Sequence, residues 1–187
     1  MTTTREWTGC VFIGVSLDGF IARPDGSLDW LTAPALRDHV APASTSPALV
    51  WETFFPTVDT VVMGRSTYET VLGFDEWAFD GKDVVVLSTT LRTDDPRIHV
   101  APSVEDVRQL LDRKGPGRVY VDGGRTIQSF LAAGMVDELT LSVAPLLLGT
   151  GRRLFGALDR DVRLTVRGVH TTPDDGLVRV TYAVTSA

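Results

Sequence analysis

Two segments of the chain each place a run of strand-forming residues directly before glycine and then a helix-like stretch. They are Val61–Tyr68 (VVMGRSTY) and Val119–Thr126 (VYVDGGRT). Such a strand-to-helix crossing presents backbone N–H groups, a helix N-terminus and a cationic side chain to a phosphate. Two crossings within 187 residues indicate a ligand with more than one phosphate group, so a nucleotide cofactor is the first candidate.

Composition and charge limit the kind of protein. Hydrophobic residues make up 43% of the chain and charged residues 22%, which predicts one globular domain over 1–187. The net charge of -6 argues against a nucleic-acid partner. Cys10 is the only cysteine, so an internal disulfide is impossible. With neither a signal-peptide pattern nor an apolar run of spanning length, we expect a cytoplasmic protein without a membrane partner.

The order of local signals predicts an α/β fold. Alternating strand and helix patterns fill the first two thirds, and Ser103 with Asp106 resembles a capping box at the start of the clearest helix. The last third alternates apolar and polar residues, as strands with two unlike faces do. Strands are expected at 10–16, 60–63, 82–88, 97–100, 119–121, 139–143, 162–169 and 177–184, and helices at 49–55, 66–72, 103–114 and 126–133. Pro56 is expected to end the helix at 49–55.

The segment 31–47 is rich in Ala, Pro, Ser and Thr, and it predicts a surface excursion. Its length fits a lid over a ligand and fits a plain connector equally well.

With these motifs in order, the chain resembles the dihydrofolate reductase fold, and more closely the bacterial proteins related to the reductase domain of riboflavin biosynthesis. The resemblance implies a three-layer α/β/α domain with a mostly parallel central sheet and antiparallel C-terminal strands. The motifs that carry it span nearly the whole chain: Ser16–Ala22 (SLDGFIA), Asp25-Gly26, Trp30, Val62–Glu69 (VMGRSTYE), Val86–Thr89 (VLST), Val121–Gly124 (VDGG), Val136–Leu139 (VDEL), Ala144-Pro145 and Gly149.

The resemblance implies NADPH as the cofactor and no metal. Arg65 would contact the 2′-phosphate, because a guanidinium matches phosphate oxygens in a bidentate way. The peptide between Gly123 and Gly124 is typically cis in this fold. The implied cofactor-binding residues are Ala22, Gly64, Arg65, Ser66, Thr67, Leu87, Ser88, Thr89, Gly123, Gly124, Arg125 and Thr126. Taken singly, each glycine motif is equally compatible with a structural turn.

Two carboxylates are the candidates for proton transfer. Dihydrofolate reductases carry an acid that here falls on Ala48, and Glu52 lies one helical turn later. Asp122 precedes the glycine pair, where the riboflavin-pathway reductases place an acidic residue that faces the substrate. The alternatives are an exposed helix glutamate and an aspartate that caps the following helix.

The substrate region is expected to be aromatic. Phe20, Trp30 and Trp51 suit a flat, uncharged ring, and Asp18 is a further candidate, although a structural Asx-turn is its alternative role. Phe20 stands where the riboflavin-pathway family usually has a lysine, which would weaken a phosphorylated substrate.

The sequence therefore predicts an NADPH-dependent reductase of a small heterocyclic or otherwise unsaturated substrate. The alternatives are 5-amino-6-(5-phosphoribosylamino)uracil reductase and an NADPH-binding protein without catalysis. A homodimer through Leu146–Gly149 and the late strands is also expected, because they offer apolar edge surface.

Overall fold

The computed structural model describes residues 5–31, 49–171 and 175–185. The expected lid at 31–47 therefore lies, apart from Leu31, outside the described residues, as does Ala48. The strands are β1 (Thr8–Ser16), β2 (Phe20–Ala22), β3 (Thr60–Gly64), β4 (Asp83–Leu87), β5 (Ile98–Ala101), β6 (Arg118–Asp122), β7 (Glu138–Ala144), β8 (Arg152–Arg153), β9 (Arg163–Thr171) and β10 (Val178–Thr185). The helices are α1 (Trp51–Phe54), a 3-10 turn (Phe55–Thr57), α2 (Arg65–Leu72), α3 (Val104–Lys114) and α4 (Gly124–Ala132).

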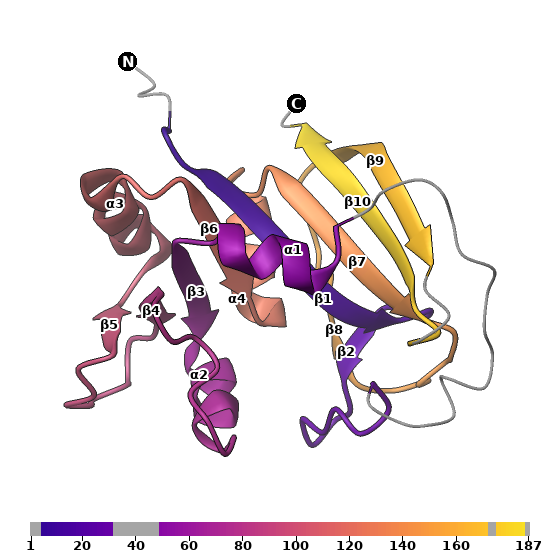
Figure 1. Cartoon of the computed structure of the whole chain (residues 1–187), viewed down its shortest axis with the longest axis horizontal. Coiled ribbons are helices and arrows are strands. Elements are labelled where there is room, and N and C mark those ends of the chain that lie inside the picture. Colours follow the sequence, from indigo (N-terminus) through magenta and orange to yellow (C-terminus); the bar gives the residue numbers. More distant parts are fainter. Residues whose placement is uncertain (1–4, 32–48, 172–174, 186–187) are drawn as a thin grey trace.

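Eight of these strands form one sheet in the order β5-β4-β3-β6-β1-β7-β10-β9 (Figure 1). The first six run parallel, and β10 pairs antiparallel with both β7 and β9. A small antiparallel ladder joins β2 to β8. The expected mostly parallel sheet with antiparallel C-terminal strands is confirmed.

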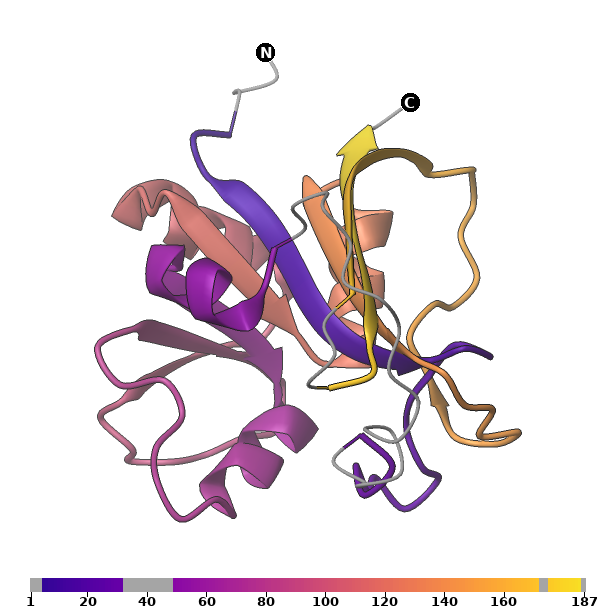
Figure 2. The same ribbon diagram turned by 45° about the vertical axis from the view of Figure 1, so that its right-hand side comes forward.

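Helices cover both faces of this sheet, as Figures 1 and 2 show for α1 in front and α4 behind. On the face of α3 and α4, Leu111 and Phe130 pack with Val11 and Val121 in one buried cluster. On the other face Phe54 of α1 and Tyr68 of α2 are among the side chains buried with Phe12 and Met63 in a second cluster. The central strands are apolar on both faces because both are buried.

The sequence signals at helix ends match the local structure. The Ser103 hydroxyl accepts a hydrogen bond from the Asp106 N–H at 3.1 Å and caps α3, and Gly115 ends that helix with φ of +63°. The helix expected at 49–55 is shorter than expected, because α1 ends at Phe54 and Pro56 enters the 3-10 turn. Pro56 sits in the first turn, where a missing N–H breaks no hydrogen bond of the helix.

One face of the β7-β10-β9 end of the sheet is apolar and only partly covered. Opposed residues in the β9–β10 ladder place Leu164, Val166 and Val169 beside Val184, Tyr182 and Val180. Side chains alternate along strands, so Arg163, His170 and Arg179 point to the opposite face. Val166 is 58% exposed. We call the set Leu164, Val166, Val169, Val178 and Val180 the apolar sheet face.

No helix in the described ranges 5–31, 49–171 and 175–185 is long and apolar enough to cross a membrane.

Candidate cofactor and active site

The two glycine motifs end neighbouring strands at the same level of the sheet. In the parallel β3–β6 ladder Met63 lies opposite Asp122, so Gly64 and Gly123 follow side by side. Each glycine is the N-cap of the next helix, α2 or α4, and neither helix start has a side-chain cap hydrogen bond. Two sets of backbone N–H groups at positive helix ends are therefore left for a ligand.

The starts of α2 and α4 pack against each other through reciprocal glycine–threonine contacts. A β-carbon on Gly64 would lie 3.0 Å from Thr126 Oγ1, and one on Gly123 would lie 2.3 Å from Thr67 Oγ1. Gly123 also has a φ of +84°, a conformation that side chains disfavour. Gly123 requires glycine, Gly64 leaves little room for a β-carbon, and both threonine hydroxyls lie at the junction.

The prediction of a cis peptide between Gly123 and Gly124 is wrong, because the described residues contain no cis peptide bond. The chain turns from β6 into α4 through the φ of +84° and ψ of 132° at Gly123 instead. Glycine is needed here for its backbone torsion and for the close contact with Thr67.

Arg65 opens α2 beside the loop that follows β4. Its guanidinium donates to Thr90 Oγ1 at 3.2 Å and lies 3.5 Å from the Glu69 carboxylate, with 49% of the side chain exposed. Ser88 Oγ accepts from the N–H groups of Thr90 and Leu91, which fixes the loop. Leu87 and Ser88 are half-buried and Thr89 is exposed, as are Ser66 and Arg125 at the starts of α2 and α4.

Arg92 reaches the same loop and was missed by the sequence reasoning. Its guanidinium donates to the carbonyl of Thr89 at 3.4 Å and to that of Leu91 at 2.9 Å. The sequence signal that could have identified Arg92 is its position three residues after Thr89, which follows the end of β4.

The β2–β8 ladder packs on the start of α4. A β-carbon on Gly124 would lie 2.8 Å from Ile21 Cδ1 and 3.1 Å from the Arg153 carbonyl oxygen. Ala22 is buried in this ladder opposite Arg152. Phe20 is buried as well, and the Arg153 guanidinium lies over its ring at 4.6 Å from the centroid. No local sequence pattern indicates that Arg153 would supply a cation above Phe20.

Asp122 ends β6 with a partly buried carboxylate. One oxygen accepts from the Gly123 N–H at 2.7 Å. Burial raises the pKa of Asp122 above its ordinary value, while hydrogen bonds from Gly123 and from the Tyr120 hydroxyl oppose that rise. Tyr120 shares the Asp122 face because the two residues are two positions apart on one strand. Its hydroxyl also lies 3.2 Å from the Phe12 carbonyl oxygen, and burial raises its pKa well above the usual value.

An aromatic cluster lies on the same face as Asp122. Trp51 is half-buried, with its ring centroid 5.5 Å from that of Phe12 and 5.6 Å from that of Tyr120. Glu52 follows it on α1 with an exposed side chain. Trp30 lies in a separate buried cluster with Ala144 and Leu148. The structure thus brings Trp51 and Tyr120 together near Asp122 and leaves Glu52 at the surface.

Asp18 holds two loops together. Its carboxylate accepts from the Ser16 hydroxyl at 2.6 Å and from the N–H groups of Leu148 and Gly149 at 3.1 and 2.7 Å. The Ser16 hydrogen bond first, and then the two backbone donors, lower the pKa of Asp18 to about 2. These contacts match the structural role that the sequence left open.

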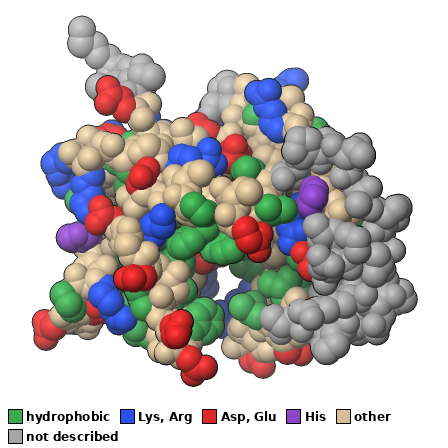
Figure 3. Space-filling view, in the orientation of Figure 1, with side chains coloured by type: hydrophobic (Ala, Val, Ile, Leu, Met, Phe, Trp, Pro, Cys, Tyr) green, Lys and Arg blue, Asp and Glu red, His purple; other side chains and the backbone are tan. Residues whose placement is uncertain are grey.

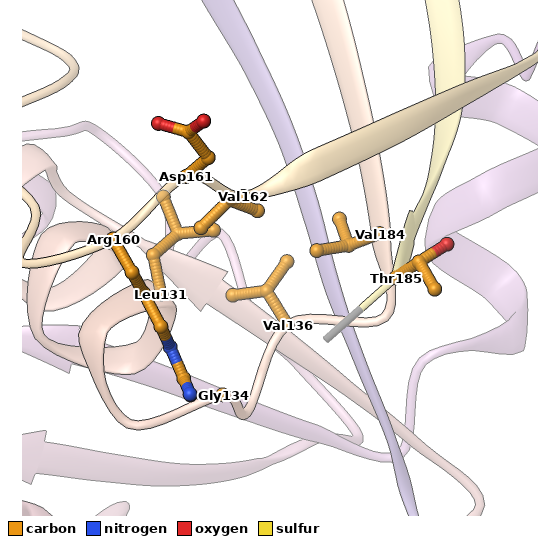
Figure 4. Close-up of a pocket in the computed structure, with 8 residues that line it drawn as sticks. All are labelled: Leu131, Gly134, Val136, Arg160, Asp161, Val162, Val184 and Thr185. Atoms are coloured by element: carbon orange, nitrogen blue, oxygen red, sulfur yellow. The ribbon is translucent and has the colours of Figure 1, made fainter. Parts of the chain in front are cut away.

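The molecule is hollowed below α1, between α2 and β2, and hydrophobic side chains border the opening (Figure 3). A second, smaller hollow, of about 20 Å³, lies elsewhere, between Leu131, Val136, Arg160 and Val184 (Figure 4). That volume holds little more than a water molecule, so this second hollow is no nucleotide site. In the described part of the chain no group of His, Cys, Asp and Glu side chains is arranged to hold a metal ion.

The fold and the paired glycine turns define a dihydrofolate reductase-like protein. A dihydrofolate reductase from Enterococcus faecalis, solved with NADP(H), superposes with a TM-score of 0.62 over 97% of this chain and 98% of its own, at 16% identity. More particularly, the RibD C-terminal domain profile matches residues 8–178, and the chain belongs to that family.

Two relatives are more similar in sequence. A protein of Shewanella sp. PV-4 assigned to riboflavin biosynthesis is 34% identical, with a TM-score of 0.80 over 96% of this chain and 99% of its own. The uncharacterized protein YwjB of Bacillus subtilis (strain 168) is 32% identical over 163 residues, 84% of this chain and 88% of its own.

Gly123→Ala should displace the start of α4, because its β-carbon would collide with Thr67 Oγ1. Gly81→Ala is the matched control, since Gly81 also has a positive φ of +72° but has no atom within 4 Å of an added β-carbon. Both variants should lose roughly 1–3 kcal/mol of stability from the backbone strain, and Gly123→Ala more from the collision. Thermal melting checks this, and equal melting temperatures of the two variants would contradict it.

Proposed function

We propose that this protein is an NADPH-dependent reductase that transfers hydride to a small heterocyclic or otherwise unsaturated substrate. The observation that carries the proposal is the contact between two uncapped helix N-termini at Gly64 and Gly123. Family membership and the dihydrofolate reductase-like fold support it.

The residues present fit the cofactor. Gly64 and Gly123 let the starts of α2 and α4 approach each other closely, so the uncapped N–H groups of both helices would face one diphosphate. Arg65 and Thr90, with Ser88, Thr89 and Leu87 behind them, would hold the adenosine end and its 2′-phosphate. The N–H groups of Ser66, Thr67, Gly124, Arg125 and Thr126 would face the diphosphate, and Ala22 would border the nicotinamide side.

The chain itself must orient the substrate and manage one proton. When bound, NADPH supplies the hydride. Asp122 is the group we assign to the proton, because its raised pKa lets the carboxyl hold one closer to neutral pH than an ordinary aspartate does. Tyr120 and the Gly123 N–H orient this carboxyl, and Trp51 and Phe12, whose rings meet edge to face, would form an apolar wall that excludes water. Glu52, exposed on α1, would reach the proton only through water.

The second candidate is the 5-amino-6-(5-phosphoribosylamino)uracil reductase reaction. The riboflavin assignment of the Shewanella relative favours it, and so does Arg153, which supplies a cation next to Phe20. Turnover of that substrate, or rescue of a riboflavin-requiring strain, would establish it. NADPH binding without oxidation by pterin, pyrimidine or quinone substrates would instead indicate a binding protein.

Arg65→Ala should weaken NADPH binding roughly 10- to 100-fold, the effect of losing a charge-assisted hydrogen bond. NADH, which lacks the 2′-phosphate, should bind this variant and the wild type equally. Fluorescence titration with both nucleotides checks this, with Arg113→Ala, an exposed arginine on α3, as the control. Failure of the wild type to bind either nucleotide would refute the reductase proposal.

Asp122→Asn should lower the reduction rate about 100-fold, because an amide cannot deliver a proton. The same variant should melt at a higher temperature than the wild type near neutral pH. A carboxyl whose pKa is raised by folding destabilises the folded state when it ionises, so the difference appears as the pH rises above the ordinary aspartate pKa. In acid, where both side chains are neutral, the melting temperatures should converge. A variant less stable than wild type at neutral pH would contradict the assignment.

We further propose a homodimer formed through the apolar sheet face. Its side chains lie on one side of β9 and β10, and Arg163, His170 and Arg179 point away, so a two-fold axis would place the apolar face against itself. The partly exposed valines would lose contact with water in such a pair.

Val166→Asp should convert the dimer to monomer, because two buried carboxylates would face the interface. Sedimentation or light scattering checks the mass, and Thr165→Asp, whose side chain points to the other face of β9, is the matched control. A monomeric wild type would exclude the dimer and leave the reductase proposal intact.

A further inference from the structure

Three buried polar atoms on or beside β7 and β10 lack hydrogen-bond partners. They are Ser142 Oγ, Trp30 Nε1 and Arg179 Nε, for which the described ranges of the chain provide no partner. Ser142 and Trp30 are each only 3% exposed. Unpaired buried polar groups are disfavoured, so native proteins retain them where a ligand or a water molecule completes the bonding.

These groups belong to one patch on the α1 face of the sheet. Ser142 of β7 lies opposite Gly14 of β1 on one side and opposite Arg179 of β10 on the other. Trp30 packs against Ala144, the next residue of β7 on the same face. The Leu31 side chain lies above Gly14, where a β-carbon would come within 2.8 Å of it.

Neighbouring hydroxyls on the same face are paired, which sets Ser142 apart. Thr140 and Thr181, one step along the same two strands, share a hydrogen bond of 3.0 Å. Thr181 Oγ1 also accepts from the Leu49 N–H at 3.3 Å. The buried hydroxyls of Thr140 and Thr181 beside Phe12 are thus hydrogen-bonded, whereas the hydroxyl of Ser142, at the next position on the same face, is not.

The patch lies within reach of a ligand that touches Asp122. Only β1 separates β6 from β7, so the two strands are about 10 Å apart at roughly 4.8 Å per spacing. Phe12 of β1 and the aromatic ring of Trp51 lie on the same face as Asp122 and Ser142. Asp122 is level with Phe12, whereas Ser142 lies opposite Gly14, two residues further along β1. A substrate that touches both would therefore have to extend past the Phe12 side chain.

The patch offers hydrogen-bond donors that suit an uncharged acceptor atom. An indole N–H, a guanidinium N–H and a hydroxyl can all donate to one oxygen. The charge of Arg179 is already balanced by its ion pair with Asp175, so the patch has no net charge for a phosphate.

We propose that Ser142, Trp30 and Arg179 form the specificity subsite for a ring carbonyl of the substrate, which is therefore an uncharged, carbonyl-bearing heterocycle. The proposal rests on the proposed function, since it places the hydride acceptor between this subsite and Asp122. The subsite selects the substrate and takes no part in proton transfer.

Binding of two matched probes tests the subsite. Quinazoline-2,4-dione carries two ring carbonyls and two ring N–H groups that quinazoline lacks on the same bicyclic frame, and tryptophan fluorescence reports the binding of both. Wild type should bind the dione at least about 10-fold more tightly, the effect of one or two hydrogen bonds. Ser142→Ala should lose that preference and melt at a higher temperature, because it removes an unpaired buried hydroxyl. Trp30→Phe, which keeps a ring and loses the N–H, should also lose the preference, and Thr165→Ala, an exposed hydroxyl on β9, should change neither property.

Three outcomes overturn the subsite: equal affinity of wild type for the two probes, no binding of the dione at about 1 mM, a concentration that corresponds to very weak binding, or unchanged dione binding by Ser142→Ala with a lowered melting temperature. The last outcome would mean that the hydroxyl is structural and holds only a water molecule. NADPH titration of the same samples separates the two proposals. A dione preference without NADPH binding supports the subsite and removes the reductase, whereas NADPH binding without a dione preference removes only the subsite.

Discussion

The register between β3 and β6 determines where everything else in the candidate site lies. Because Met63 is opposite Asp122, both strands stop at the same height and both helices start there. A shift of one residue would turn Asp122 to the other face and separate Gly123 from Thr67. The valines of β3 and β6, buried on both faces, specify this register through packing alone. The proposed phosphate cradle is thus a consequence of core packing rather than of the loops.

Much of the fold was predictable because local signals and tertiary structure agree. The capping serine at 103, the glycine at 115 and the alternation in β7, β9 and β10 act over a few residues and survive in the structure. Where a residue had two compatible local states, prediction was less exact. Pro56 can stop a helix or begin a 3-10 turn, and only the packing of Phe54 under β1 and β6 decides between them.

The site was predictable in its motifs and not in its contacts between distant elements. The glycine turns and Asp122 follow strands and can be found from the sequence. The stacking of Arg153 on Phe20 depends on the pairing of a three-residue strand with a two-residue strand, which leaves no periodic pattern. Ser142 and Arg179 become neighbours only because β10 returns beside β7, and nothing local marks either residue. The prediction of a cis peptide was wrong for a different reason, because a positive φ at Gly123 makes the same turn with a trans peptide bond.

The hydrogen bonds of the Asp18 carboxylate restrict movement of the loops beside the hollow between α2 and β2. It clamps the β1–β2 turn to the loop after β7, and the Leu17 N–H and the Leu154 N–H add two more ties between the same regions. With a pKa of about 2, this clamp stays charged at any pH that a cell experiences. The β2–β8 ladder, which packs on Gly124, is therefore a fixed wall rather than a flap. The proposed cofactor and substrate would therefore enter and leave along another side.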